Sequence, residues 1–328
     1  MSAPVMKAAI YEGHGSASEV LRVEEVERPE PGPGQVRVRM RLSGVNPTDW
    51  KARAGATPRP IDDFQIPQHD GVGVIDAVGD GVDAGRVGQR VWTFLAASGN
   101  RWGTAAQWSV LPSRQAVQLP EGASDELGAC LGVPAMTAHR CLFADGPVAG
   151  KNALVAGGAG AVGHFAIELA KFSGARVAST VSGPQKAELA RQAGADLVVN
   201  YHDADAASQL RGFAAEMDRI VEVALGANLE LDLALSGPRT HIVDYAAEST
   251  DPVLPVRKCM NANVALRFIL LYGVPAEALD QAATDITRAL QAGALTALPV
   301  TRFALEQIAA AHEAVEHGAV GKVVVEIP

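Results

Sequence analysis

Cysteine is scarce in this chain, long apolar runs are missing, and lysine and arginine form no extended cluster. Three cysteines, Cys130, Cys141 and Cys259, do not suggest a disulfide framework, so we interpret them as small core residues with reduced thiols. No stretch approaches the roughly 18–20 uninterrupted apolar residues of a membrane-spanning helix. The net charge of −9, without a long basic run, makes nucleic acid or an anionic membrane surface a poor candidate for the main partner.

The first residues, MSAPVMKAAIYEGHG, lack the apolar core of a secretory signal, so we expect a cytoplasmic protein. Apolar residues are nevertheless plentiful, because 48% of the 328 residues are hydrophobic and a sizeable core can be buried. At about 100–200 residues per domain, this length predicts two domains.

Residues 1–122 are predicted to form a twisted, mostly antiparallel β domain. Short strand-like runs such as QVRVRMRL (35–42) and GVGVIDAVG (71–79) are separated by turn signals such as PEPGPGQ and GDGVDAG. In the first run, Val36, Val38 and Met40 alternate with arginines, which is typical of a half-buried strand.

The pattern changes after this domain. Residues 123–268 alternate short apolar runs with longer alanine-rich stretches, which predicts a parallel, doubly wound sheet of the Rossmann type. Gly174 and Gly194 stand where helices are expected to end. Residues 269–328 contain two helical stretches and a final strand, GKVVVEI (321–327), and we expect them to return and complete the first domain.

A glycine-rich loop between a predicted strand and a predicted helix indicates a dinucleotide site. Its G-x-G-x-x-G pattern permits a tight turn, close approach of the backbone to a pyrophosphate, and close packing of helix on strand. Free N–H groups at the helix start then meet the phosphates. The alternative is a loop that merely turns a corner. The predicted cofactor-binding residues of the loop are Gly158, Ala159, Gly160, Ala161, Val162 and Gly163.

The region after the next predicted strand favours NADP(H). An NAD-type site needs an acid about 20 residues beyond the glycines, to bind the ribose 2′-hydroxyl. No acid lies between Glu168 and Glu188, and the region offers Ser182 and Lys186 instead, groups that suit a 2′-phosphate. Two alternatives stay open: Ser182 as a helix N-cap and Lys186 as a solvated helix residue.

Local spacing predicts no catalytic metal, although it leaves dispersed ligands open. The chain has no C-x-x-C pair. His312 and His317 lie five residues apart on a predicted helix, about 140° around its axis. Zinc-binding H-E-x-x-H motifs place their histidines four apart. We therefore interpret both histidines as solvated helix residues.

Four motifs in order carry a resemblance: GVNPTDW (44–50), P-x-x-D-G-x-G (67–73), the glycine loop, and GKVVVEI. Over essentially its whole length the chain resembles the medium-chain dehydrogenase/reductase superfamily. Within it, the chain looks like the zinc-free quinone oxidoreductase branch that includes zeta-crystallin. The resemblance implies a GroES-like twisted β domain, a Rossmann domain and a homodimer.

The resemblance also bears on zinc. Zinc-dependent relatives have a cysteine ligand where this chain has Asn46, a His–Glu pair at His69 and Asp70, and a third ligand near Val133. Because the first and third positions are not ligands here, the resemblance implies a site without zinc. His69 is then interpreted as a packing or hydrogen-bonding residue.

Similar family members use NADPH to reduce quinones, or the activated C=C bond of enones and enals. The resemblance places Asn46 near the nicotinamide and substrate, and Thr137 at the nicotinamide end. Lys186 and Tyr201 would lie at the adenosine phosphate. The stretch 268–273, FILLYG, would pass beside the nicotinamide ring and includes Leu270, Leu271 and Tyr272.

Lys51 departs from the zeta-crystallin pattern, which usually has a tyrosine there, and resembles the enone and alkenal reductases of the same branch. Hydride addition leaves negative charge on the substrate oxygen, which a cation or donor stabilises. Lys51 and Asn46 are therefore the predicted catalytic residues. The alternatives are a surface lysine and a turn former. Two other functions stay open: a zinc alcohol dehydrogenase and a non-catalytic NADPH-binding module.

Overall fold

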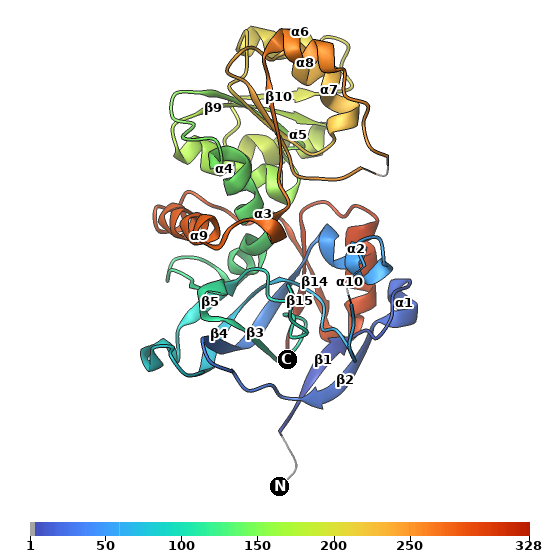
Figure 1. The fold of residues 1–328 in the computed structure, drawn as a ribbon, viewed down its shortest axis with the longest axis vertical. Helices are drawn as coiled ribbons and strands as arrows, with labels where there is room; N and C mark the ends of the chain where they lie inside the picture. The colour runs from blue at the N-terminus through green and yellow to red at the C-terminus, as the bar shows by residue number, and fades with distance from the viewer. Residues whose placement is uncertain (1–3, 59, 249) are drawn as a thin grey trace. The chain divides into compact units, whose positions relative to one another are not determined.

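The computed structural model describes residues 4–58, 60–248 and 250–328, and the chain divides into two compact units (Figure 1). Unit 1 comprises Met1–Val133 and Ala297–Pro328, and unit 2 comprises Pro134–Thr296. The boundaries expected after residues 122 and 268 differ from this division. The first half of helix α3 (Asp125–Phe143) stays with unit 1 because its Val133 N–H binds Asp70. Residues 269–296 stay with unit 2, since α9 (Ala276–Gln291) packs against α4 (Ala161–Phe172).

Unit 1 is built on a mostly antiparallel sheet. In the described residues the strand order is β14-β15-β3-β4-β5-β7, and β6 also pairs with β3. β14 and β15 form a parallel pair, whereas the other pairs are antiparallel. These strands are β3 (Gln35–Val45), β4 (Asp70–Val78), β5 (Arg90–Thr93), β6 (Trp108–Pro112), β7 (Ala116–Gln118), β14 (Val300–Ala304) and β15 (Lys322–Glu326).

A second, smaller sheet of unit 1 pairs β1 (Val5–Ile10) with β2 (Arg22–Glu27) in antiparallel register. Its buried residues share a core with those of β15 and α10, including Ile10, Val323 and Ile308. The helices of unit 1, besides the start of α3, are α1 (Ala17–Val20), α2 (Pro47–Ala54) and α10 (Ile308–Glu316).

Strand β3 positions the residues of interest in unit 1. Val36, Val38 and Met40 are buried and Arg39 and Arg41 are exposed, so the predicted alternation is confirmed. Arg37 is the exception, because it is buried against Asp76, whose carboxylate accepts a 2.8 Å hydrogen bond from its Nε. Strand β15 pairs antiparallel with β3, and Val323 lies opposite Val45. That register brings the start of β15 beside the end of β3, where α2 begins.

Unit 2 is a doubly wound sheet, as the sequence predicts. All pairs are parallel, in the order β10-β9-β8-β11-β12-β13 within the described residues. The order reverses between β8 and β11, which is the place where such sheets bind ligands at the carboxyl ends of their strands. The strands are β8 (Asn152–Ala156), β9 (Arg176–Val181), β10 (Leu197–Asn200), β11 (Arg219–Glu222), β12 (His241–Asp244) and β13 (Ala265–Phe268).

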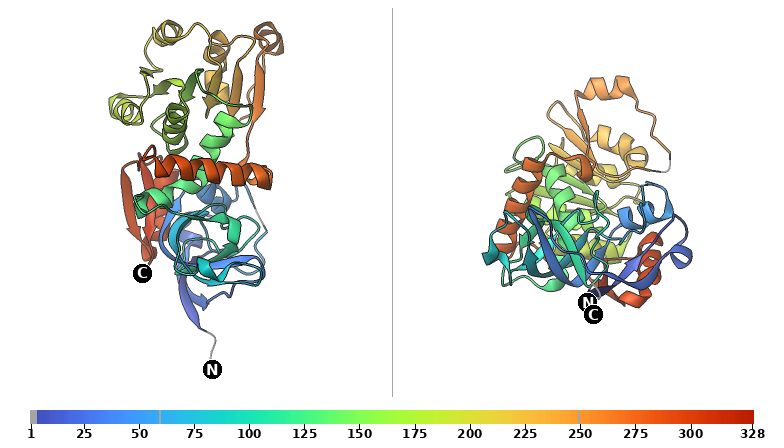
Figure 2. Two further views of the ribbon diagram at one scale, coloured as in Figure 1. Left: turned by 90° about the vertical axis from the view of Figure 1, so that its left-hand side faces the viewer. Right: turned by 60° about the horizontal axis from the view of Figure 1, so that its bottom comes forward.

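Helices cover the sheet of unit 2. Besides α4 and α9, they are α5 (Pro184–Gln192), α6 (Ala206–Phe213), α7 (Leu225–Ala234) and α8 (Val256–Ala262). Figure 1 shows α6 and α7 on one side of the sheet and α4 on the other, and the left view of Figure 2 shows α9 along its length. The predicted helix stops are confirmed, because Gly174 and Gly194 follow α4 and α5 with φ of +83° and +97°. No helix in the described residues is long and apolar enough to cross a membrane.

Candidate active site

Helix α2 begins directly after β3, and Asn46 is its N-cap, with no side-chain hydrogen bond to the helix. The Asn46 N–H donates to Oδ2 of Asp49 at 2.7 Å, which satisfies a backbone group at the helix start. Pro47 occupies the first helical position, where its missing N–H costs nothing. The Asn46 side chain therefore turns toward the body of unit 1 rather than capping its own helix.

The Asn46 side chain lies between two buried charged groups. Its Nδ2 donates to Oδ2 of Asp70 at 2.7 Å, and its Oδ1 accepts from the ammonium of Lys322. Nζ of Lys322 lies 3.7 Å from Oδ2 of Asp70, and the other oxygen, Oδ1, accepts from the Val133 N–H at 2.7 Å. Asn46, Asp70 and Lys322 are all 3% exposed or less. We call these three residues the Asn46 cluster.

Close packing and burial set the electrostatics of the cluster. Burial raises the pKa of Asp70 above its ordinary value, while Lys322, Asn46 and the Val133 N–H act in the opposite direction. Burial also raises the pKa of the nearby Cys130 thiol to about 12, so this cysteine stays protonated. Gly132 makes room for the carboxylate, since a Cβ there would lie 2.1 Å from Oδ1 of Asp70.

Lys51 lies on α2 with its side chain only partly buried. Its Nζ is 5.9 Å from the centroid of the Trp50 ring, a cation–π contact. The buried cation that contacts Asn46 is Lys322 instead. Lys322 belongs to the GKVVVEI motif, and the sequence analysis predicted no catalytic role for it. A catalytic role for Lys51 stays a prediction.

Two histidines of unit 1 lie in the interior. His69 is 2% exposed, with Nε2 at 4.0 Å from Oδ1 of Asp49, which agrees with a packing residue. The prediction of a solvated His312 is wrong: it is fully buried, with Nε2 at 3.5 Å from Nε2 of Gln68. Burial lowers the pKa of His312 to about 3, so it is neutral. His317, just beyond α10, is exposed as expected.

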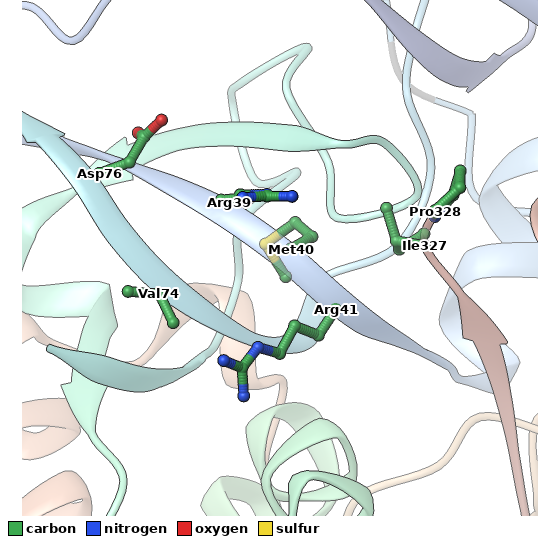
Figure 3. Close-up of a pocket in the computed structure, with 7 residues that line it drawn as sticks. All are labelled: Arg39, Met40, Arg41, Val74, Asp76, Ile327 and Pro328. Atoms are coloured by element: carbon green, nitrogen blue, oxygen red, sulfur yellow. The ribbon is translucent and has the colours of Figure 1, made fainter. Parts of the chain in front are cut away.

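Within the parts of the chain that the structure describes, no group of three or more His, Cys, Asp or Glu side chains is placed to hold a metal ion. A separate groove of about 470 Å³ lies along β3 and β4 in unit 1 (Figure 3). Arg39, Met40, Arg41, Val74, Asp76, Ile327 and Pro328 line it, and none of them belongs to the Asn46 cluster.

The glycine loop of unit 2 connects β8 to α4 at the carboxyl edge of the sheet. Gly163 fits the predicted role, because a Cβ there would lie 2.4 Å from the Gly157 carbonyl oxygen. The positive φ of +67° falls on Gly157, one residue before the expected motif. A Cβ at Gly158 would lie 2.0 Å from Oγ of Ser179, so this glycine serves close packing rather than the turn.

The same loop fits a pyrophosphate. Gly160 is exposed and is the N-cap of α4, whose first N–H groups have no acceptor within the helix. Ala161 and Val162, in the first turn, are partly exposed. The loop therefore offers accessible backbone donors at the positive end of a twelve-residue helix, which is the arrangement that binds phosphate groups.

Three predicted residues lie after the next two strands of the sheet. Ser182 follows β9, and Nζ of Lys186 donates to its Oγ at 3.0 Å. Tyr201 follows β10, its N–H donates to the Val181 carbonyl oxygen at 3.1 Å, and its side chain is 47% exposed. The N-cap alternative for Ser182 is wrong, because α5 begins at Pro184 with Gly183 as its N-cap and no side-chain cap.

The other predicted residues of unit 2 are more scattered. Leu270, Leu271 and Tyr272 follow β13 at the same carboxyl edge, and Leu271 is buried whereas Leu270 is 70% exposed. Thr137 is buried in α3, 5% exposed. The structure thus groups the loop, Ser182, Lys186, Tyr201 and residues 270–272 along one edge of the sheet, with Thr137 on a helix.

An acidic group at this edge was missed by sequence reasoning. Glu222 ends β11 and is fully buried, and its Oε1 accepts from the N–H groups of Val223 and Ala224, both at 2.6 Å. Burial and the neighbouring Glu222 raise the pKa of Asp232 well above its ordinary value. Burial likewise raises the pKa of Asp244 to about 6. Strand-end carboxylates are too common in sequence to reveal such a cluster.

Comparison with known proteins agrees with this architecture. Residues 32–121 match the alcohol dehydrogenase GroES-like domain, and residues 161–288 match the zinc-binding dehydrogenase family. The human quinone oxidoreductase is 29% identical over 313 residues, 93% of each chain. A chloroplastic quinone-oxidoreductase homolog of Spinacia oleracea is 32% identical over 69% of this chain and 70% of its own. A mycobacterial protein complexed with NADPH has a TM-score of 0.84 at 27% identity, covering 98% of this chain and 99% of its own.

The chain combines two units that match known dehydrogenase domains with a glycine loop at the carboxyl edge of a parallel sheet. Together with the similar proteins, these features define an oxidoreductase that uses a nicotinamide cofactor. The chain belongs to the medium-chain dehydrogenase/reductase superfamily, in its quinone oxidoreductase branch. The predicted combination of a GroES-like unit with a Rossmann unit is confirmed.

Proposed function

We propose that the protein is an NADPH-dependent reductase that delivers hydride to a quinone or an activated α,β-unsaturated carbonyl, without zinc. The observation that carries the proposal is the Asn46 cluster. An amide held by Lys322 and Asp70 occupies the position where the resemblance gives zinc-dependent relatives a thiolate ligand. A buried ammonium in contact with that position makes it unsuited to a second cation.

NADPH is favoured by the strand ends of unit 2. The Lys186 ammonium and the Ser182 hydroxyl, 3.0 Å apart, supply a cation and a donor where an NAD-type site has an acid. The exposed Tyr201 ring lies at the neighbouring strand end and offers a surface for the adenosine. The NADPH in the similar mycobacterial protein supports the same choice.

When bound, NADPH would supply a hydride to a substrate carbon, and the electron pair that this displaces would move onto the substrate oxygen. The chain must then stabilise the oxygen until a solvent proton arrives. We assign this task to the amide N–H of Asn46 and to the ammonium of Lys51. Thr137 and residues 270–272 would contact the nicotinamide end.

We further propose a homodimer formed through the edge of the unit 2 sheet. Strand β13 is an edge of the sheet among the described residues and carries the exposed Phe268, with the exposed Leu270 two residues further on. Met260 on α8, 69% exposed, adds apolar surface in the same unit. An unpaired strand edge with apolar side chains is a natural site for pairing with a second copy.

An acceptor panel tests the function. NADPH oxidation is followed by absorbance with quinones, enones and enals, for wild type, Lys51→Ala and the control Lys7→Ala. Lys7 is a surface lysine of unit 1 paired with Glu306 at 3.6 Å. We expect Lys51→Ala to lose about tenfold in kcat on acceptors whose oxygen must be polarised, and Lys7→Ala to match wild type. Stoichiometric zinc in the purified enzyme, or no turnover of any acceptor, would overturn the proposal.

A further inference from the structure

The charges beside Asn46 permit one orientation of its amide. Lys322, 3% exposed, can only donate, and it donates to Oδ1. The Asp70 carboxylate can only accept, and it accepts from Nδ2 at 2.7 Å. A rotated amide would direct hydrogens at the ammonium and an oxygen at the carboxylate. Both contacts would then be repulsive inside a buried cluster.

Asp70 is itself held in place. Its Oδ1 accepts from the Val133 N–H at 2.7 Å, and Nζ of Lys322 lies 3.7 Å from its Oδ2. A Cβ at Gly132 would overlap the carboxylate, so helix α3 closes that side. The orientation of Asn46 thus depends on an anchor from β4, a cation from β15 and the backbone of α3.

One hydrogen of the Asn46 amide is left over. Nδ2 carries two hydrogens, and Asp70 takes one. The second has no partner among residues 4–58, 60–248 and 250–328. A donor whose direction is fixed before the reaction stabilises a developing oxyanion without reorganisation during the reaction.

We propose that Lys322 and Asp70 are positioning residues, which orient the Asn46 amide so that its remaining Nδ2 hydrogen serves the substrate oxygen. The inference rests on the proposed function, because it requires Asn46 to be the donor. In this role Lys322 acts through its contact with Asn46 rather than on the reacting atoms. Its contribution to turnover should therefore vanish when the amide is removed.

A double-mutant cycle tests this dependence, with kcat and KM measured for wild type, Lys322→Met, Asn46→Ala and the double variant. We expect Lys322→Met to lower kcat about tenfold or more in the wild-type background, with KM for NADPH nearly unchanged. In the Asn46→Ala background, the same substitution should change kcat less than about twofold. Lys322→Arg keeps the charge and the donor, and should recover most of the lost kcat.

Two further variants and two checks of folding make the outcome decisive. Lys7→Met removes a surface lysine of the same unit and should leave kcat unchanged. Thermal unfolding and NADPH binding establish that each variant is folded. The combined variant Lys322→Met/Asp70→Asn leaves no unpaired charge in the cluster. It replaces Lys322→Met in the double-mutant cycle if that single variant does not fold.

Equal losses of kcat in both backgrounds, or no rescue by arginine, would overturn the positioning role while the proposed function stands. Absence of turnover in the wild type on every quinone, enone and enal would overturn the proposed function itself, and this role with it.

Discussion

Removing the Lys322 ammonium should make the stability of unit 1 depend steeply on pH. In Lys322→Met, the fully buried Asp70 carboxyl keeps two hydrogen-bond donors and loses its cation. A buried charge without a partner is strongly unfavourable, so the carboxyl instead takes up a proton on folding. Burial already raises the pKa of Asp70 in the wild type, and Lys322 opposes that rise.

The free energy needed to protonate Asp70 on folding sets how much stability the variant loses. Each pH unit above the ordinary carboxyl pKa near 3.9 costs about 1.4 kcal/mol, because the unfolded chain releases the proton and the folded one retains it. We therefore expect the stability lost in Lys322→Met, relative to wild type, to grow with pH once the wild-type Asp70 is ionised, and to stay below about 4 kcal/mol at pH 7, because the wild-type pKa is itself raised. This limit lies within the roughly 3–5 kcal/mol typical of a broken buried ion pair.

Tryptophan fluorescence provides a selective assay. The four tryptophans, Trp50, Trp92, Trp102 and Trp108, all belong to unit 1. Urea unfolding followed by their emission between pH 5 and 8 therefore reports the unit that contains the Asn46 cluster. The variant Lys322→Met/Asp70→Asn should lose this pH dependence. A free-energy difference between Lys322→Met and wild type that stays constant across this range would refute the reasoning.

Three further outcomes are expected. Gly163→Ala places a Cβ 2.4 Å from the Gly157 oxygen, so fluorescence titration should show NADPH affinity weakened about tenfold or more. Lys186→Ala should raise KM for NADPH about tenfold and leave KM for NADH unchanged in steady-state assays. Burial raises the pKa of Asp244 to about 6, so its contribution to stability is present below the unfolded pKa and lost as pH rises through 6. Asp244→Asn should therefore raise the thermal midpoint more at pH 7 than at pH 4.

Local patterns carried most of the correct predictions. The alternation in β3, the glycines after α4 and α5, and the loop before α4 each involve neighbouring residues whose physical requirements can be read directly. The absence of an acid between Glu168 and Glu188 can also be read from neighbouring residues alone. Its interpretation required only the order of strands and helices, which the alternating pattern supplies.

The features that sequence reasoning missed depend on residues far apart. Lys322 and Asn46 are separated by 276 positions, and only the pairing of β15 with β3 brings them together. His312 was interpreted as solvated because its five-residue spacing from His317 does not suit a metal site, yet it is buried on a helix that packs into unit 1. The shift of the turn to Gly157 reflects backbone angles, which a run of glycines leaves open.

The position of β15 has a consequence for synthesis of the protein. Unit 2 is one continuous segment, whereas unit 1 needs residues on both sides of it. On a ribosome, unit 2 can fold while β3 and β4 still lack the strand that bears Lys322. Asp70 meets its cation only after the whole of unit 2 has been synthesised. We therefore expect the nascent first segment, in which the end of β3 lacks its β15 partner, to be open to misfolding and to capture by chaperones.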